Sequence, residues 1–139
     1  MKKYIHYRDG YKYQLAEPYM QNIGIKPPNE IGNEYVLLYP DGMIMISKSY
    51  AWDGPSGPCP DWPSVMRFSL IHDALYQLMR EEMLPQSFRY AADCLALKLP
   101  REDGLPWALC QVVYHAVRFG GGPSANPKHD RKVITAPKG

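Results

Sequence analysis

One stretch of the chain, residues 49–64, limits the possible folds more than any other. Its sequence, SYAWDGPSGPCPDWPS, holds four prolines and two glycines in sixteen positions. Proline lacks a backbone N–H and glycine weakens both regular structures, so this stretch cannot form a helix or a central strand. We therefore predict a long structured loop, a kind of segment that tends to be functional in compact domains. It separates a half that is typical of strands from a half that is typical of helices.

The residues before the loop predict a small antiparallel sheet. The runs YKYQL (11–15) and YVLLY (35–39) are short and rich in β-prone residues. The sequence PDG at 40–42 is typical of a turn and precedes a further β-prone run, MIMIS (43–47). We expect residues 34–47 to form a hairpin, which is marginal by itself and needs another element to cover one face.

The residues after the loop predict three helices, at about 64–83, 85–99 and 106–119. Each carries apolar residues at helical spacing, and Pro106 suits the first turn of the third helix. The glycines at 120–122 are expected to end that helix. The residues expected to be buried are Val65, Phe68, Ile71, Leu75, Leu78 and Met79 in the first helix, Phe88, Ala92, Leu95 and Leu99 in the second, and Leu109, Val112, Val113 and Ala116 in the third.

The size and composition are those of a single globular domain. The chain has 139 residues, of which 45% are hydrophobic and 22% charged. We predict one α+β domain over residues 1–122 and a basic, proline-containing tail over 123–139. The net charge of only +2 argues against a nucleic-acid partner. No apolar run approaches the roughly 18 residues of a transmembrane segment.

The first residues and the cysteines bear on where the protein is made. The sequence MKKYIHYRDGYKY has two lysines but no apolar segment after them, so we expect synthesis in the cytoplasm without a signal peptide. The three cysteines have no metal-ligand spacing and are expected to be reduced thiols.

The segment SLIHDALYQLM (69–79) places a histidine and an aspartate inside an apolar run. Burying an imidazole and a carboxylate is costly unless each finds a partner. His72 and Tyr76 are one helical turn apart, as are Arg89 and Asp93 on the next predicted helix. The short link between these helices predicts antiparallel packing, which brings Asp93 level with His72. We therefore expect Asp93 to accept a hydrogen bond from one ring nitrogen of His72.

A histidine held in this way is a candidate general base that activates water. Asp73 and the loop residue Asp53, together with loop carbonyls, are candidate ligands for Ca²⁺, which takes about 6–8 oxygen atoms. Zinc fits less well because no cysteine and only one histidine are suitably placed. A structural network is the alternative, because these polar groups can satisfy one another. In particular, Arg89 paired with Asp93 would neutralise the site.

The sequence HDALY (72–76), with an aspartate 21 residues after the histidine, resembles the secreted phospholipase A2 superfamily, most closely its small prokaryotic branch. The loop DGPSGPCPD (53–61) is similar to the calcium loop of those enzymes. The chain departs from them at Ile71, where the lipases have a disulfide cysteine, and at Arg89, which their pattern does not require. The resemblance implies that His72 is the base, Asp93 its orienting partner, Tyr76 a hydroxyl that supports the carboxylates, and Asp73, with the weaker matches Asp53 and Gly54, the calcium ligands.

A second resemblance covers roughly residues 35–122. The successive sequences WDGPSGP, HDALY, RYAAD and AVRFGG are similar to an uncharacterised family of small phage- and prophage-encoded proteins. The two resemblances together imply a Ca²⁺-dependent hydrolase of acyl esters in host envelope lipids, made in the host cytoplasm and then associated with the particle or released at lysis. The alternative is a non-enzymatic particle, tail or assembly protein that binds other phage proteins.

Overall fold

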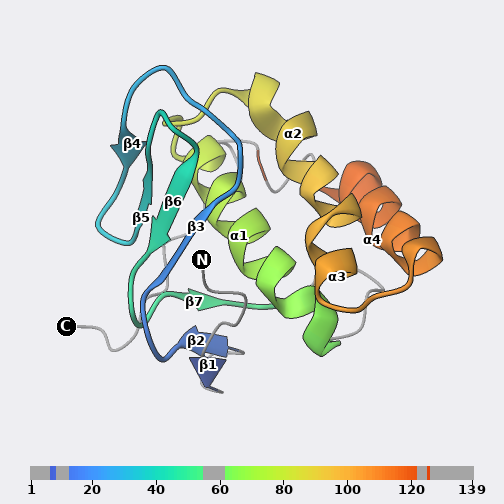
Figure 1. Cartoon of the computed structure of the whole chain (residues 1–139). Helices are drawn as coiled ribbons and strands as arrows, with labels where there is room; N and C mark the ends of the chain where they lie inside the picture. The colour runs from blue at the N-terminus through green and yellow to red at the C-terminus, as the bar shows by residue number, and fades with distance from the viewer. Residues whose placement is uncertain (1–6, 9–12, 55–61, 122–124, 126–139) are drawn as a thin grey trace. The chain divides into compact units, whose positions relative to one another are not determined.

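The computed structural model describes residues 7–8, 13–54, 62–121 and 125 (Figure 1). These residues have the predicted α+β class, with two small antiparallel sheets followed by helices. They divide into two compact units, one ending at Asp53 and one beginning at Gly54. Apart from Ala125, the predicted tail at 123–139 lies outside the described residues.

The first unit contains both sheets. The three-stranded sheet has the order β1 (Tyr7–Arg8), β2 (Tyr13–Leu15), β7 (Ala51–Trp52), and the four-stranded sheet has the order β3 (Tyr19–Asn22), β6 (Met43–Ile46), β5 (Val36–Leu38), β4 (Ile31–Gly32). All neighbouring strands in both sheets are antiparallel.

The predicted hairpin is formed by β5 and β6. Leu38 lies opposite Ile44, and both side chains are fully buried. In the turn, the N–H of Gly42 donates to the carbonyl of Tyr39 at 2.9 Å. Gly42 has a φ of 93°, a left-handed conformation that glycine adopts without strain. The sequence PDG therefore marks this turn for a clear physical reason.

Four other strands, β1, β3, β4 and β7, were not predicted. β7 lies inside the stretch that was expected to be a loop, but it has two residues and pairs only with β2, opposite Tyr13 and Gln14. Such a short strand depends on a partner that is distant in sequence, so local composition does not reveal it. Residues 55–61 of the predicted loop lie outside the described residues.

The first predicted helix is present as α1 (Pro63–Arg80), and all of its expected buried residues are buried. It ends three residues before the predicted end. Glu82 adopts a φ of 61°, and the N–H of Met83 donates to the carbonyl of Leu78 at 2.9 Å. This is a Schellman termination, which usually uses glycine at the left-handed position. Because a glutamate stands there, the sequence contains no signal for this end.

The prediction of one continuous second helix was wrong. The segment consists of a short 3₁₀ turn, η1 (Gln86–Phe88), then α2 (Arg89–Cys94), a second 3₁₀ turn, η2 (Leu95–Leu97), and α3 (Leu99–Glu102). Pro100 has no N–H to continue the helical hydrogen bonds, so the helix tightens before it and restarts. Of the expected buried residues, Ala92, Leu95 and Leu99 are buried and Phe88 is half-buried.

The third predicted helix is α4 (Trp107–Gly120), which packs against α2, η2 and α3 (Figure 1). Its predicted orientation was partly wrong. Val113 is buried as expected, but the other buried residues are Cys110 and Val117, while Val112 is 57% exposed. The helix has apolar residues on nearly every side, so periodicity does not identify its inner face.

Arg67 joins α1 to the end of α3 inside the second unit. Its side chain is only 4% exposed, and its guanidinium donates twice to the carboxylate of Asp103, at 2.9 and 3.1 Å. A third bond of 2.9 Å goes to Glu102.

In the described part of the chain, no helix combines the length and apolar character that crossing a membrane requires.

Candidate active site

The contact expected between α1 and the following segment is present. α1 carries His72 and Tyr76 one turn apart, and α2 runs back alongside it with Asp93 (Figure 1). Nε2 of His72 lies 2.6 Å from Oδ1 of Asp93, and the hydroxyl of Tyr76 donates to the same oxygen at 2.5 Å. The rings of His72 and Tyr76 lie against each other, with centroids 4.1 Å apart. His72 and Tyr76 therefore meet at the carboxylate of Asp93.

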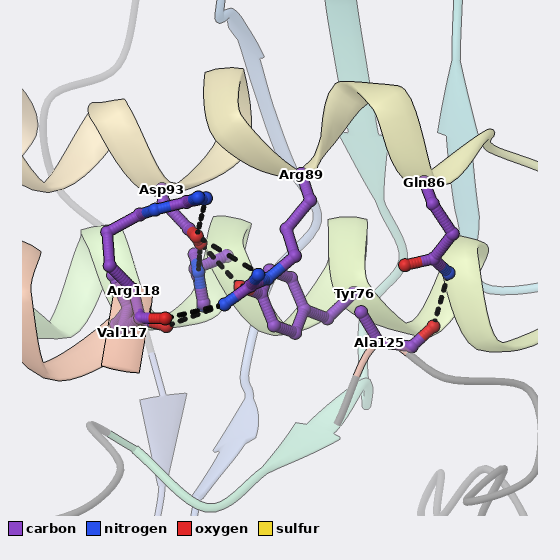
Figure 2. A network of polar contacts seen from close by, with 8 residues as sticks. Tyr76, Gln86, Arg89, Asp93, Val117, Arg118 and Ala125 are labelled. Carbon is purple, nitrogen blue, oxygen red and sulfur yellow. Dashed lines mark hydrogen bonds and ion pairs between the residues drawn. The ribbon is translucent and has the colours of Figure 1, made fainter. Parts of the chain in front are cut away.

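Asp93 is completely buried, and its second oxygen faces two arginines, one on α4 and one on α2 itself (Figure 2). Oδ2 accepts a hydrogen bond of 2.9 Å from Arg118 on α4. Nε of Arg89, one turn before Asp93 on α2, lies 3.7 Å from the same oxygen. Both carboxylate oxygens are therefore paired, and two guanidinium groups supply the compensating charge that a buried carboxylate requires.

Arg89 also binds the end of α4 (Figure 2). One of its terminal nitrogens donates to the carbonyl of Arg118 at 2.8 Å, and its Nε donates to the hydroxyl of Tyr76 at 3.1 Å. Carbonyls in the last turn of a helix have no intrahelical partner, and a cation placed there is favourable. Arg89 thus holds α1, α2 and α4 together in addition to pairing with Asp93.

The chain after α4 covers Tyr76. A Cβ atom on Gly121 would lie 2.5 Å from the hydroxyl oxygen of Tyr76, so only glycine fits there. Farther on, Nε2 of Gln86 donates to the carbonyl of Ala125 at 2.6 Å (Figure 2). Gly121, the first residue after α4, therefore leaves room for the hydroxyl of Tyr76 at the polar site.

The environment fixes the protonation states of the three central groups. Burial lowers the pKa of His72 below 6.5, despite the opposing effect of Asp93, so the imidazole is neutral at pH 7. Burial alone would raise the pKa of Asp93, but hydrogen bonds from His72 and Tyr76 outweigh this and lower it. Burial and the bond to Asp93 raise the pKa of Tyr76, which stays protonated.

These states define the tautomer of His72. A neutral imidazole facing an ionised carboxylate carries its proton on the facing nitrogen, here Nε2. Nδ1 then has a free lone pair, and Asp93 is the partner of the ring in every hydrogen bond that the described residues make with it. The side chain of His72 is 6% exposed. The group can accept a proton at Nδ1, where the general-base hypothesis needs it.

The predicted calcium ligands are divided between the two units. Asp53 is exposed and belongs to the first unit, whereas Gly54 and the half-buried Asp73 belong to the second. Among the described residues, no three histidine, cysteine, aspartate or glutamate side chains form a group that could hold a metal. The loop expected to supply carbonyl ligands, residues 55–61, lies outside the described residues, so the calcium site stays a prediction.

Sequence reasoning missed Arg118 as a member of the site. The available signal was the sequence AVRFGG, which contains Arg118 and Gly121 and was already noted as a motif in the sequence. Nothing local to Arg118 shows that it reaches a carboxylate 25 residues earlier.

No protein-family model matches the chain, and neither the curated proteins nor the solved structures contain a match.

Proposed function

We propose that this protein is a phage- or prophage-encoded hydrolase in which His72 activates water for attack on an acyl ester. One observation carries the proposal: a neutral imidazole is held by Asp93 through Nε2 at 2.6 Å, which leaves the lone pair of Nδ1 for a proton. The resemblance of HDALY and its distant aspartate to phospholipase A2 supports a phospholipid of the host envelope as substrate.

The proposed reaction needs only groups of this chain and water. Nδ1 of His72 takes a proton as the water oxygen attacks the ester carbonyl, and the carboxylate of Asp93 stabilises the imidazolium that forms. The tetrahedral intermediate then collapses, the ester C–O bond breaks, and His72 returns the proton to the leaving alkoxide. Calcium, which the resemblance implies, would polarise the ester carbonyl. No step above is assigned to it.

The test is hydrolysis of a fluorescently labelled phospholipid, with Ca²⁺ or with a chelator. His72→Asn preserves side-chain polarity but removes the basic nitrogen, so we expect the rate to fall at least about 10²-fold. Glu30→Gln, a single substitution at an exposed loop position, is the control and should retain the wild-type rate. Equal rates in the two variants, with both folded by circular dichroism, would exclude His72 as the base.

A second function is favoured by the pairing of Asp93. This carboxylate has 0% exposure and binds donors from α1 and α4, while Arg89 holds three helices together. Such a network suits a particle, tail or assembly protein in which the polar groups fix helix positions. In a phage that encodes the chain, His72→Asn would then leave infectivity unchanged, and the protein would remain with purified particles.

A further inference from the structure

The outer side of α4 carries an apolar stripe that the rest of the described chain leaves exposed. Ala108, Val112, His115 and Phe119 are all exposed, and Phe119 reaches 96%. On a helical wheel, these four residues fall within about 60°, directly opposite the buried side of the helix. We call these four residues the outer face. A helix with apolar residues on both sides normally has both sides covered.

The spacing of the outer face is that of a helix-to-helix contact. Successive members are separated by four, three and four residues, which is the alternation that lets one helix pack lengthwise against another. The stripe contains no lysine, arginine, aspartate or glutamate, so two copies of it would not repel each other. An extended helix surface of this kind fits another helix better than it fits a small ligand.

The sizes of the side chains along the outer face point to a second copy of the chain as the partner. The spacing four, three, four is the same in both directions along the helix, so the outer face can meet an antiparallel copy of itself in register. In that register, Phe119 of each copy lies opposite Ala108 of the other, so this pair occurs at both ends of the contact. Val112 of each copy lies opposite His115 of the other. The largest side chain thus meets the smallest, which is how well-packed surfaces interdigitate. A twofold axis between Val113 and Tyr114 relates the two helices, as in most homodimers.

We propose that the protein forms a homodimer by antiparallel pairing of the outer faces of two α4 helices. Each α4 has 14 residues and is about 21 Å long, so the paired area is smaller than that of a standard permanent interface. We therefore expect a dissociation constant on the order of 10 µM, within reach of sedimentation measurements. This proposal is independent of the chemistry assigned to His72.

Sedimentation equilibrium of the full chain tests the proposal. The wild type should change from monomer to dimer between about 1 and 300 µM. Ala108→Glu and Phe119→Lys each place a charge against an apolar residue, so each variant should associate at least about 10-fold more weakly. Met20→Lys, which introduces lysine at an exposed apolar position on β3, is the control and should dimerise like the wild type.

Mixing the two variants tests the register. In the antiparallel arrangement, the glutamate introduced at 108 faces the lysine introduced at 119 of the other chain, and the second pair is the wild-type Phe119 with Ala108. The mixture should therefore regain the dimer that neither variant forms alone. A wild-type monomer throughout the concentration range, or dimers that the single variants do not weaken, would overturn the proposal. Failure of the mixture to recover would overturn the antiparallel register.

Discussion

Replacing Asp93 by asparagine perturbs the site at its most connected residue. The substitution keeps the shape of the side chain but removes its charge and replaces one oxygen by an NH₂ group. The remaining oxygen can still accept from His72 or Tyr76. The new NH₂ group then faces the guanidinium of Arg118, 2.9 Å from the present Oδ2, and donor meets donor.

The expected cost follows from these contacts. A hydrogen bond to a charged group contributes about 1.5–3 kcal/mol, and removing one member of a buried ion pair costs about 3–5 kcal/mol. The side chain of Arg118 is 33% exposed and can turn towards solvent, which places the loss at the lower end. We expect Asp93→Asn to reduce the free energy of unfolding by about 3 kcal/mol. Because the pKa of Asp93 is lowered by folding, its contribution is fully present at pH 7.

Urea unfolding at pH 7, followed by far-ultraviolet circular dichroism, measures this loss. Glu30→Gln, the equivalent acid-to-amide change at an exposed loop position, is the control and should stay within about 0.5 kcal/mol of wild type. If Asp93→Asn also stayed within about 1 kcal/mol, the ion pairs and hydrogen bonds described for Asp93 would not stabilise the fold, and the reasoning would fail.

Three further predictions use the same unfolding assay. Gly121→Ala should cost about 1–3 kcal/mol because its Cβ would clash with the carbonyl of Val117 as well as with the hydroxyl of Tyr76; an unchanged midpoint would contradict these contacts. Arg67→Lys should cost about 2 kcal/mol, since lysine cannot make the paired bonds to Asp103; full stability would show that those bonds contribute little. Folding lowers the pKa of His72, so the stability due to its neutral form is present above pH 6.5 and is lost as the pH falls below that value. The resulting fall in the free energy of unfolding, up to about 1.4 kcal/mol per pH unit, should be absent in His72→Asn. An equal pH dependence in both proteins would refute this.

The parts of the fold that were predicted correctly have local causes. The β5–β6 hairpin follows from two short β-prone runs and a turn that needs glycine at Gly42. α1 follows from its apolar spacing and from Pro63 in its first turn. The parts that were missed depend on distant partners or unusual choices: β7 needs β2, and the end of α1 uses Glu82 in place of glycine.

The candidate site was predicted as far as helical spacing allows. The helical position of His72 and the short link to the next segment were enough to place Asp93 against His72. Arg118 could not be placed, because it depends on how α4 is rotated about its axis. Because apolar residues lie on both sides of the helix, the sequence does not show which side faces the core. Val112 was predicted to be buried for the same reason, and it is exposed.

The state of the His72 imidazole is the central claim, and nitrogen NMR of histidine-labelled protein measures it most directly. Among the four histidines, the His72 signal is identified by its loss in His72→Asn. We expect a neutral ring at pH 7 with its proton on Nε2, an unprotonated Nδ1, and titration below pH 6.5. A ring protonated on both nitrogens at pH 7, or one with its proton on Nδ1, would contradict the account.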